Sequence, residues 1–69
     1  MTESAEQLYK RALSEIQKEQ WLAAIKLLKR ALAPAQKNWR FSWNLGWCYF
    51  KLRKFEDARK HMVRAARLA

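Results

Sequence analysis

Residues 39–69 read WRFSWNLGWCYFKLRKFEDARKHMVRAARLA, and they match the pattern of residues 5–35, AEQLYKRALSEIQKEQWLAAIKLLKRALAPA, at a shift of 34 positions. Under this shift small residues fall on small ones: Ala12 on Gly46, Ala24 on Ala58 and Ala31 on Ala65. Large apolar residues also pair, namely Tyr9 with Trp43, Leu13 with Trp47, Ile16 with Phe50, Trp21 with Phe55 and Leu28 with Met62. A fixed period of this size indicates a repeat that buries its apolar face by stacking on a copy of itself.

The length and composition favour one small helical domain. The chain has 69 residues with one Gly and one Pro, and it is rich in Ala, Leu, Lys, Arg, Glu and Gln, which are good helix formers. We therefore expect a single domain over residues 1–69, with one repeat over about 5–38 and a second over 39–69.

Apolar residues recur at helical spacing over four segments, which run from Thr2 or Ser4 to Lys18, from Trp21 to Ala33, from Lys37 or Asn38 to Leu52, and from Phe55 to Leu68. Ser4 and Asn38 are the expected N-caps, because their side chains accept hydrogen bonds from free backbone amides. Pro34 ends the second helix, since it lacks an N–H and disfavours helical geometry at the preceding residue. Short links make the helices of each pair antiparallel neighbours. The predicted fold is all-α, with two stacked antiparallel helix–turn–helix hairpins.

The third of these helices is apolar on two sides. One stripe comprises Leu45, Gly46, Tyr49 and Leu52, and the other comprises Trp39, Trp43, Trp47 and Phe50. The clearly polar residues are Arg40, Ser42, Asn44 and Lys51. A helix that is apolar on both sides is normally covered on both. Its hairpin partner and the first hairpin cannot cover both sides completely, so we expect some aromatic surface to stay exposed.

The charge of +9 is unevenly distributed. Residues 1–19 carry four acids and three bases, whereas residues 20–69 carry twelve bases against Glu56 and Asp57. This part of the chain should attract polyanions or acidic partners; an ordinary solvated helix surface is the alternative. Seven of the bases lie on the second and fourth helices: Lys26, Lys29, Arg30, Arg59, Lys60, Arg64 and Arg67. Nucleic-acid binding therefore stays open as an alternative function, although the aromatic residues are expected on the opposite face.

The residues give no support for an enzyme. The sequence has no Gly-rich phosphate loop, no paired carboxylates in apolar surroundings and no supported nucleophile–base pair. Cys48 and His61 are the only residues of their kinds, so a Cys/His metal-ligand set is absent. We expect Cys48 to be a small buried residue and His61 to lie at a surface or edge. The sequence thus predicts no catalytic residue, no cofactor and no metal.

No apolar run approaches the ~20 residues of a membrane span. The first six residues are polar and acidic, unlike the basic start and apolar stretch of a secretion signal. These features predict a cytoplasmic protein without a membrane partner.

The period and its pattern resemble the tetratricopeptide repeat, a 34-residue helix–turn–helix with the motif W-x2-L-G-x2-Y…A-x3-F…P. The second copy matches at Leu45, Gly46, Tyr49, Ala58, Met62 and Ala65, with Ser42 at the place of the motif's Trp. The first copy matches at Ala12, Ala24, Leu28 and Ala31, and Pro34 comes two residues early. We expect Gly46 and Ala12 at the points where the two helices of a hairpin cross, since a larger side chain there would push the helix axes apart. The family's aromatic at the start of the second helix implies core positions for Trp21 and Phe55.

The resemblance implies a non-catalytic interaction module that binds a peptide or partner helix in a concave groove. The groove residues implied are Tyr9, Leu13, Gln17, Arg40, Trp43, Asn44, Trp47 and Lys51. An aromatic groove with a basic rim suits an apolar or amphipathic segment that carries negative charge. The alternative for Tyr9, Ile16, Trp43 and Phe50 is packing of one hairpin on the other. For Asn44, which stands where many members bond the ligand backbone, the alternative is a solvated polar residue.

Two repeats are fewer than the three that such folds usually need. The last helix is expected to pack through Ala58, Met62, Ala65 and Ala66, and still to leave an apolar edge. This possible self-association edge comprises Trp39, Met62, Ala66 and Leu68. Burying it against a second copy predicts a homodimer. The alternative is an excised or designed fragment of a longer array.

Overall fold

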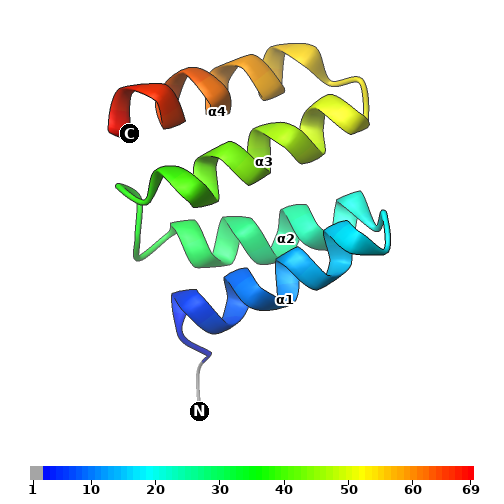
Figure 1. The fold of residues 1–69 in the computed structure, drawn as a ribbon, viewed down its shortest axis with the longest axis vertical. Helices are drawn as coiled ribbons and strands as arrows, with labels where there is room; N and C mark the ends of the chain where they lie inside the picture. Colours follow the sequence, from blue (N-terminus) through cyan, green and yellow to red (C-terminus); the bar gives the residue numbers. More distant parts are fainter. Residues whose placement is uncertain (1–2) are drawn as a thin grey trace.

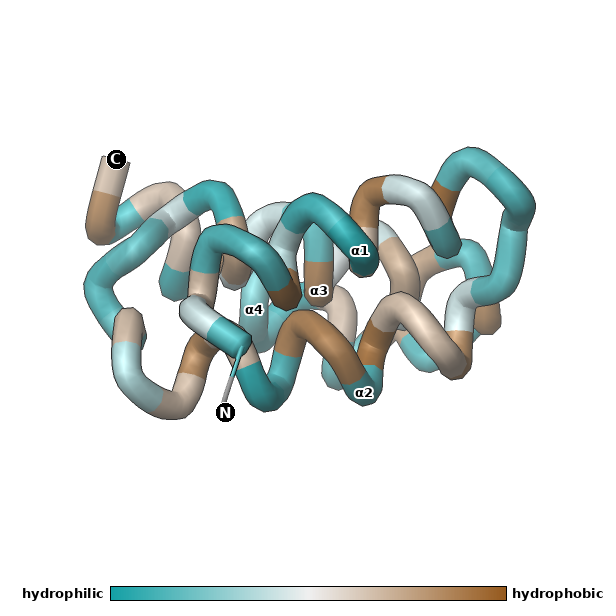
Figure 2. The backbone as a smooth tube through the Cα atoms, turned by 90° about the horizontal axis from the view of Figure 1, so that it is seen from below, coloured by the Kyte–Doolittle hydropathy of each residue, from teal (hydrophilic) through white to brown (hydrophobic). Residues whose placement is uncertain are grey.

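A computed structural model describes residues 3–69, and over this range the chain forms four helices and no strands. The helices are α1 (Ala5–Gln17), α2 (Trp21–Leu32), α3 (Trp39–Lys51) and α4 (Phe55–Leu68). α1 and α2 form one antiparallel hairpin, α3 and α4 form the next, and α2 packs against α3 between them (Figure 1). Brown, hydrophobic stretches alternate with teal ones along α2, as in an amphipathic helix (Figure 2). The predicted all-α stack of two hairpins is confirmed.

Both predicted N-caps are present. The Ser4 hydroxyl accepts a hydrogen bond from the Gln7 amide at 3.1 Å, and the Gln7 side chain accepts one from the Ser4 amide at 2.8 Å. This reciprocal capping box satisfies two free amides at the start of α1. The Asn38 side chain accepts a hydrogen bond from the Arg40 amide at 3.1 Å and caps α3. The alternative start at Thr2 falls outside the described residues.

Three helix ends differ from their predicted positions by one residue. Lys18, Ala33 and Leu52 are C-caps rather than the last helical residues. Pro34 follows α2 as predicted.

The two hairpin turns have the same conformation. Glu19 and Arg53, which are 34 residues apart, have positive φ angles of 58° and 62°. In the first turn the Gln20 amide donates to the Glu15 carbonyl at 2.9 Å, and the Lys54 amide donates to the Tyr49 carbonyl at 2.9 Å in the second. These bonds close a Schellman motif at each helix end. The repeat therefore extends from the helix faces to the turn geometry.

Small residues line the crossing inside each hairpin, as the sequence predicts. Ala12 and Ala24 are fully buried, and Ala58 is 3% exposed. A Cβ atom placed on Gly46 would lie 2.7 Å from Met62 Cγ and 3.0 Å from the Ala58 carbonyl oxygen. Such contacts are too short for a side chain, so the close approach of α3 to α4 depends on Gly46.

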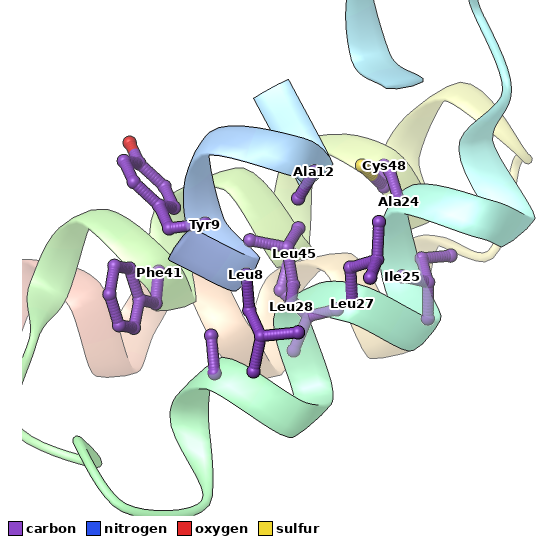
Figure 3. Packing of buried hydrophobic residues seen from close by; sticks show 11 residues of the cluster. Leu8, Tyr9, Ala12, Ala24, Ile25, Leu27, Leu28, Phe41, Leu45 and Cys48 are labelled. Carbon is purple, nitrogen blue, oxygen red and sulfur yellow. The ribbon is translucent and has the colours of Figure 1, made fainter. Parts of the chain in front are cut away.

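The core lies between the hairpins and draws on α1, α2 and α3 (Figure 3). Phe41 is its largest fully buried side chain, and the sequence stripes missed it. Its counterpart in the first repeat is the polar Gln7, so the repeat gave no sign of an apolar position. Ser42, one of the few polar residues of α3, is fully buried, and its Oγ has no hydrogen-bond partner in residues 3–69. Cys48 is buried as predicted, and burial raises the pKa of its thiol to about 11.

Two expectations about the last hairpin are wrong. Phe55 is 55% exposed rather than in the core, whereas Trp21 is partly buried against it. Ala66 is exposed rather than packed, whereas Met62 and Leu68 are partly exposed, as expected for the apolar edge. The physical reason is the same for both, because among the described helices none covers the outer side of α3 and α4.

Replacing Gly46 by Leu should destabilise the fold by about 1–3 kcal/mol, because the new side chain overpacks the α3–α4 crossing. The measurement is the free energy of unfolding from denaturant melts. Lys26→Leu adds the same side chain at an exposed position of α2 and should change stability by no more than about 0.5 kcal/mol. Equal stability of the two variants would contradict the crossing assigned to Gly46.

Candidate functional site

The predicted binding residues lie on α1 and α3, and we call the surface that they form the α1–α3 face. It comprises Tyr9, Leu13, Gln17, Arg40, Trp43, Asn44, Trp47 and Lys51. Tyr9 is 9% exposed and belongs to the core, and Asn44 is partly buried. The other six are exposed. The packing alternative is therefore correct for Tyr9, whereas Trp43 remains 47% exposed.

Asn44 links α3 to α1. Its Nδ2 donates hydrogen bonds to the Tyr9 hydroxyl and to the Arg40 carbonyl, both at 2.9 Å. The Tyr9 ring lies 4.6 Å from the Phe41 ring, between centroids. The hydroxyl of a mostly buried tyrosine thus finds its polar partner at the rim of the core, which holds the two hairpins in register.

Arg40 bridges the same two helices through its side chain. Its Nη2 lies 3.5 Å from Glu6 Oε1, and its guanidinium carbon lies 5.7 Å from the centroid of the Tyr9 ring. Both partners of the ion pair are about half exposed. Water screens such a pair, so it contributes at most about 1 kcal/mol to stability. Arg40 therefore keeps most of its capacity to bind a second carboxylate.

Three exposed aromatic side chains and the partly buried Trp21 form a row, which comprises Trp21, Trp47, Phe50 and Phe55. The Trp47 ring stacks on Phe50 at 5.8 Å, and Phe50 meets Phe55 edge-on at 5.6 Å. Lys51 Nζ lies 5.4 Å from the Trp47 ring and 5.7 Å from the Trp21 ring. Because the rings and the ammonium group hold one another in place, this aromatic row presents an ordered surface.

A second apolar feature lies at the other end of α3. Trp39, Trp43, Ala65, Ala66 and Ala69 line a hollow of about 280 Å³, and the lining is entirely apolar. We call it the end hollow. Trp43 lies on the same side of α3 as Trp47, one helical turn away, and lines the end hollow, whereas Trp47 does not. Two residues of the predicted self-association edge, Trp39 and Ala66, lie here, whereas Met62 is not among the lining residues.

The seven bases of α2 and α4 are all exposed, as predicted. Lys29 and Arg64 line a shallow pocket of about 240 Å³ at the contact between the hairpins, together with His61. The Tyr49 ring stacks on His61 at 5.5 Å, and Lys29 Nζ lies 5.8 Å from the Tyr49 ring. His61 was predicted at a surface or edge without this stack, because the contact depends on how α4 faces α3.

Among residues 3–69, no group of three or more His, Cys, Asp or Glu residues is placed to hold a metal ion. None of the helices formed by these residues is long and apolar enough to cross a membrane.

Comparison with protein families gives one match. A family model described as a tetratricopeptide repeat matches residues 15–68, which is most of the chain. Comparisons with curated proteins and with solved structures give no match.

The stability of the fold should fall as the pH drops below about 6.5. Burial and the neighbouring Lys60 lower the pKa of His61 from its usual 6.5, with Asp57 opposing them. The folded state therefore disfavours the charged imidazole. The free energy of unfolding should be constant above the unfolded-state pKa and decrease below it, until the folded-state pKa is passed.

Denaturant melts at several values between about pH 7.5 and 5 would measure this effect, since carboxylates titrate near pH 4. His61→Gln should flatten the profile in that window. An unchanged slope in this variant would assign the pH dependence to another group.

Proposed function

The chain belongs to the tetratricopeptide repeat family, whose members generally mediate protein–protein interaction, and we propose that it binds a peptide or a partner helix on its α1–α3 face. The module acts by binding and carries out no catalysis. The observation that carries the proposal is the aromatic row beside Lys51.

Ordered aromatic side chains suit a binding surface for energetic reasons. Trp, Tyr and Arg are enriched among the residues that dominate binding energy at protein interfaces. A Trp side chain buries a large area on binding, and its stiffness limits the entropy lost. Trp47 is already stacked on Phe50 and flanked by Lys51, so little further order is needed when a ligand covers it.

The charges of this surface define the chemistry of the ligand. Arg40 and Lys51 stand at the two ends of α3, one beside Glu6 and one beside Trp47. A segment with apolar side chains for the aromatic row and carboxylates for these two bases would complement the surface. The proposed ligand is therefore an apolar segment with negative charge.

Nucleic-acid binding, the alternative from the net charge, would use the bases of α2 and α4 rather than the aromatic row. It requires binding that weakens steeply with added salt and that is insensitive to Trp47. The two functions thus predict opposite effects for the same variants.

Panning a random-peptide display library on the folded chain should enrich acidic peptides with apolar residues. The affinity of synthesised winners, measured by fluorescence anisotropy, should fall about tenfold or more for Trp47→Ala and measurably for Lys51→Gln. Both positions are exposed, so the variants should retain the helical circular dichroism and melting of the parent.

Lys26→Gln on α2 is the matched control for charge, because it removes one exposed base away from α3. It should leave peptide affinity unchanged. Peptides that bind Trp47→Ala and the parent equally well would refute the proposal.

A further inference from the structure

The end hollow is the second copy of a surface that is already filled in the first hairpin. Its five lining residues fall, at the shift of 34, on Ala5, Tyr9, Ala31, Leu32 and Ala35. Tyr9 and Ala31 are part of the buried core, and the other three pack against that core. The same set of positions is thus buried in the first hairpin and open in the second.

The filled copy shows what the open one accommodates. In the first hairpin, α3 lies against this surface and brings the Phe41 ring onto Tyr9, where Phe41 is 1% exposed. In the second hairpin the position of Tyr9 is taken by Trp43, which is 47% exposed. α3 fills the matching surface of the first hairpin. A helix that filled the end hollow in the same way would place an aromatic side chain on Trp43.

An ion pair of the filled copy specifies the charge of that helix. The residue before Phe41 is Arg40, and it pairs with Glu6 of α1. The counterpart of Glu6 in the second hairpin is Arg40 itself. A helix docked in the same way would therefore need an acidic residue directly before its aromatic one. Residues 37–69 carry nine bases and only two acids, so the whole surroundings favour an acidic helix.

A second copy of this chain fits the end hollow poorly. Stacked head to tail, it would present Gln7, Arg11 and Ser14 at the positions where α3 presents Phe41, Leu45 and Cys48. All three are exposed and polar, and none fills an apolar hollow. Joined through two last hairpins, the copies would bring two strongly basic surfaces together, which costs binding energy.

We propose that the end hollow docks an amphipathic, acidic helix of another protein, with an aromatic side chain between Trp39 and Trp43 and an acidic residue beside Arg40. This surface is separate from the aromatic row. The proposed docking site nevertheless shares Trp43 and Arg40 with the α1–α3 face.

The probe for this site is a stapled helical peptide with the sequence of residues 38–52, in which Arg40 and the exposed aromatics Trp39, Trp43, Trp47 and Phe50 are changed to Glu. It keeps Phe41, Leu45 and Cys48, which α3 presents to the first hairpin. Labelled peptide is titrated with the full chain and followed by fluorescence anisotropy. We expect saturable binding of this peptide. Its affinity should fall about tenfold or more when the peptide carries Phe41→Ala, and it should also fall when Arg40 of the peptide is left unchanged.

Variants of the protein locate the contact. Ala66→Glu places a charge in the end hollow at an exposed position and should weaken binding about tenfold or more. Its matched control, Ser14→Glu, adds the same charge on the outer side of the first hairpin and should have no such effect. Trp47→Ala should leave this binding unchanged, and this result would separate the end hollow from the aromatic row.

Three results would overturn the inference. One is no saturable binding of the probe up to about 1 mM protein. Another is a binding affinity that changes neither with Phe41→Ala in the probe nor with Ala66→Glu in the protein. The third is a homodimer, seen by sedimentation without the probe, that Ala66→Glu dissociates, since the occupant would then be a second copy.

Discussion

The close approach of the two helices within each hairpin is the constraint on which this structure depends. Gly46 lets α3 meet α4, and Ala12 and Ala24 do the same for α1 and α2. Because this seam is filled by small residues, the large side chains of α3 project elsewhere. Some of them are covered by the neighbouring hairpin, as Phe41 is, and others remain partly exposed, as Trp47 does at 38%. Packing inside the hairpins thus determines which surfaces remain for partners.

Local and periodic signals made most of the fold predictable. Helix ends follow from single residues, such as the caps Ser4 and Asn38 and the breaker Pro34, whose effects do not depend on distant contacts. The crossings follow from small residues that recur at the same place in both repeats. The sequence therefore sufficed for the four helices, their pairing and the positions of Ala12 and Gly46.

The burial of individual side chains was not predictable in the same way. Phe41 is buried beside Tyr9 of the neighbouring hairpin, and Phe55 is exposed because no described helix covers it. These outcomes depend on where a residue stands in the stack rather than on its place in the repeat. Tyr9 and Trp43 show this most clearly, since the same repeat position is in the core in one hairpin and 47% exposed in the other.

The two ends of the stack differ in chemistry, and this difference bears on how the chain associates. At the first end, Gln7 and Arg11 replace the residues that would continue an apolar stack, so water solvates that surface. At the last end, Trp39 and Trp43 remain open beside α4, although burying a large apolar side chain is worth about 1.5–3 kcal/mol. A stack with two apolar ends would add copies without limit. One polar and one aromatic end do not complement each other in a head-to-tail stack, and this difference supports the proposal of a partner with another sequence.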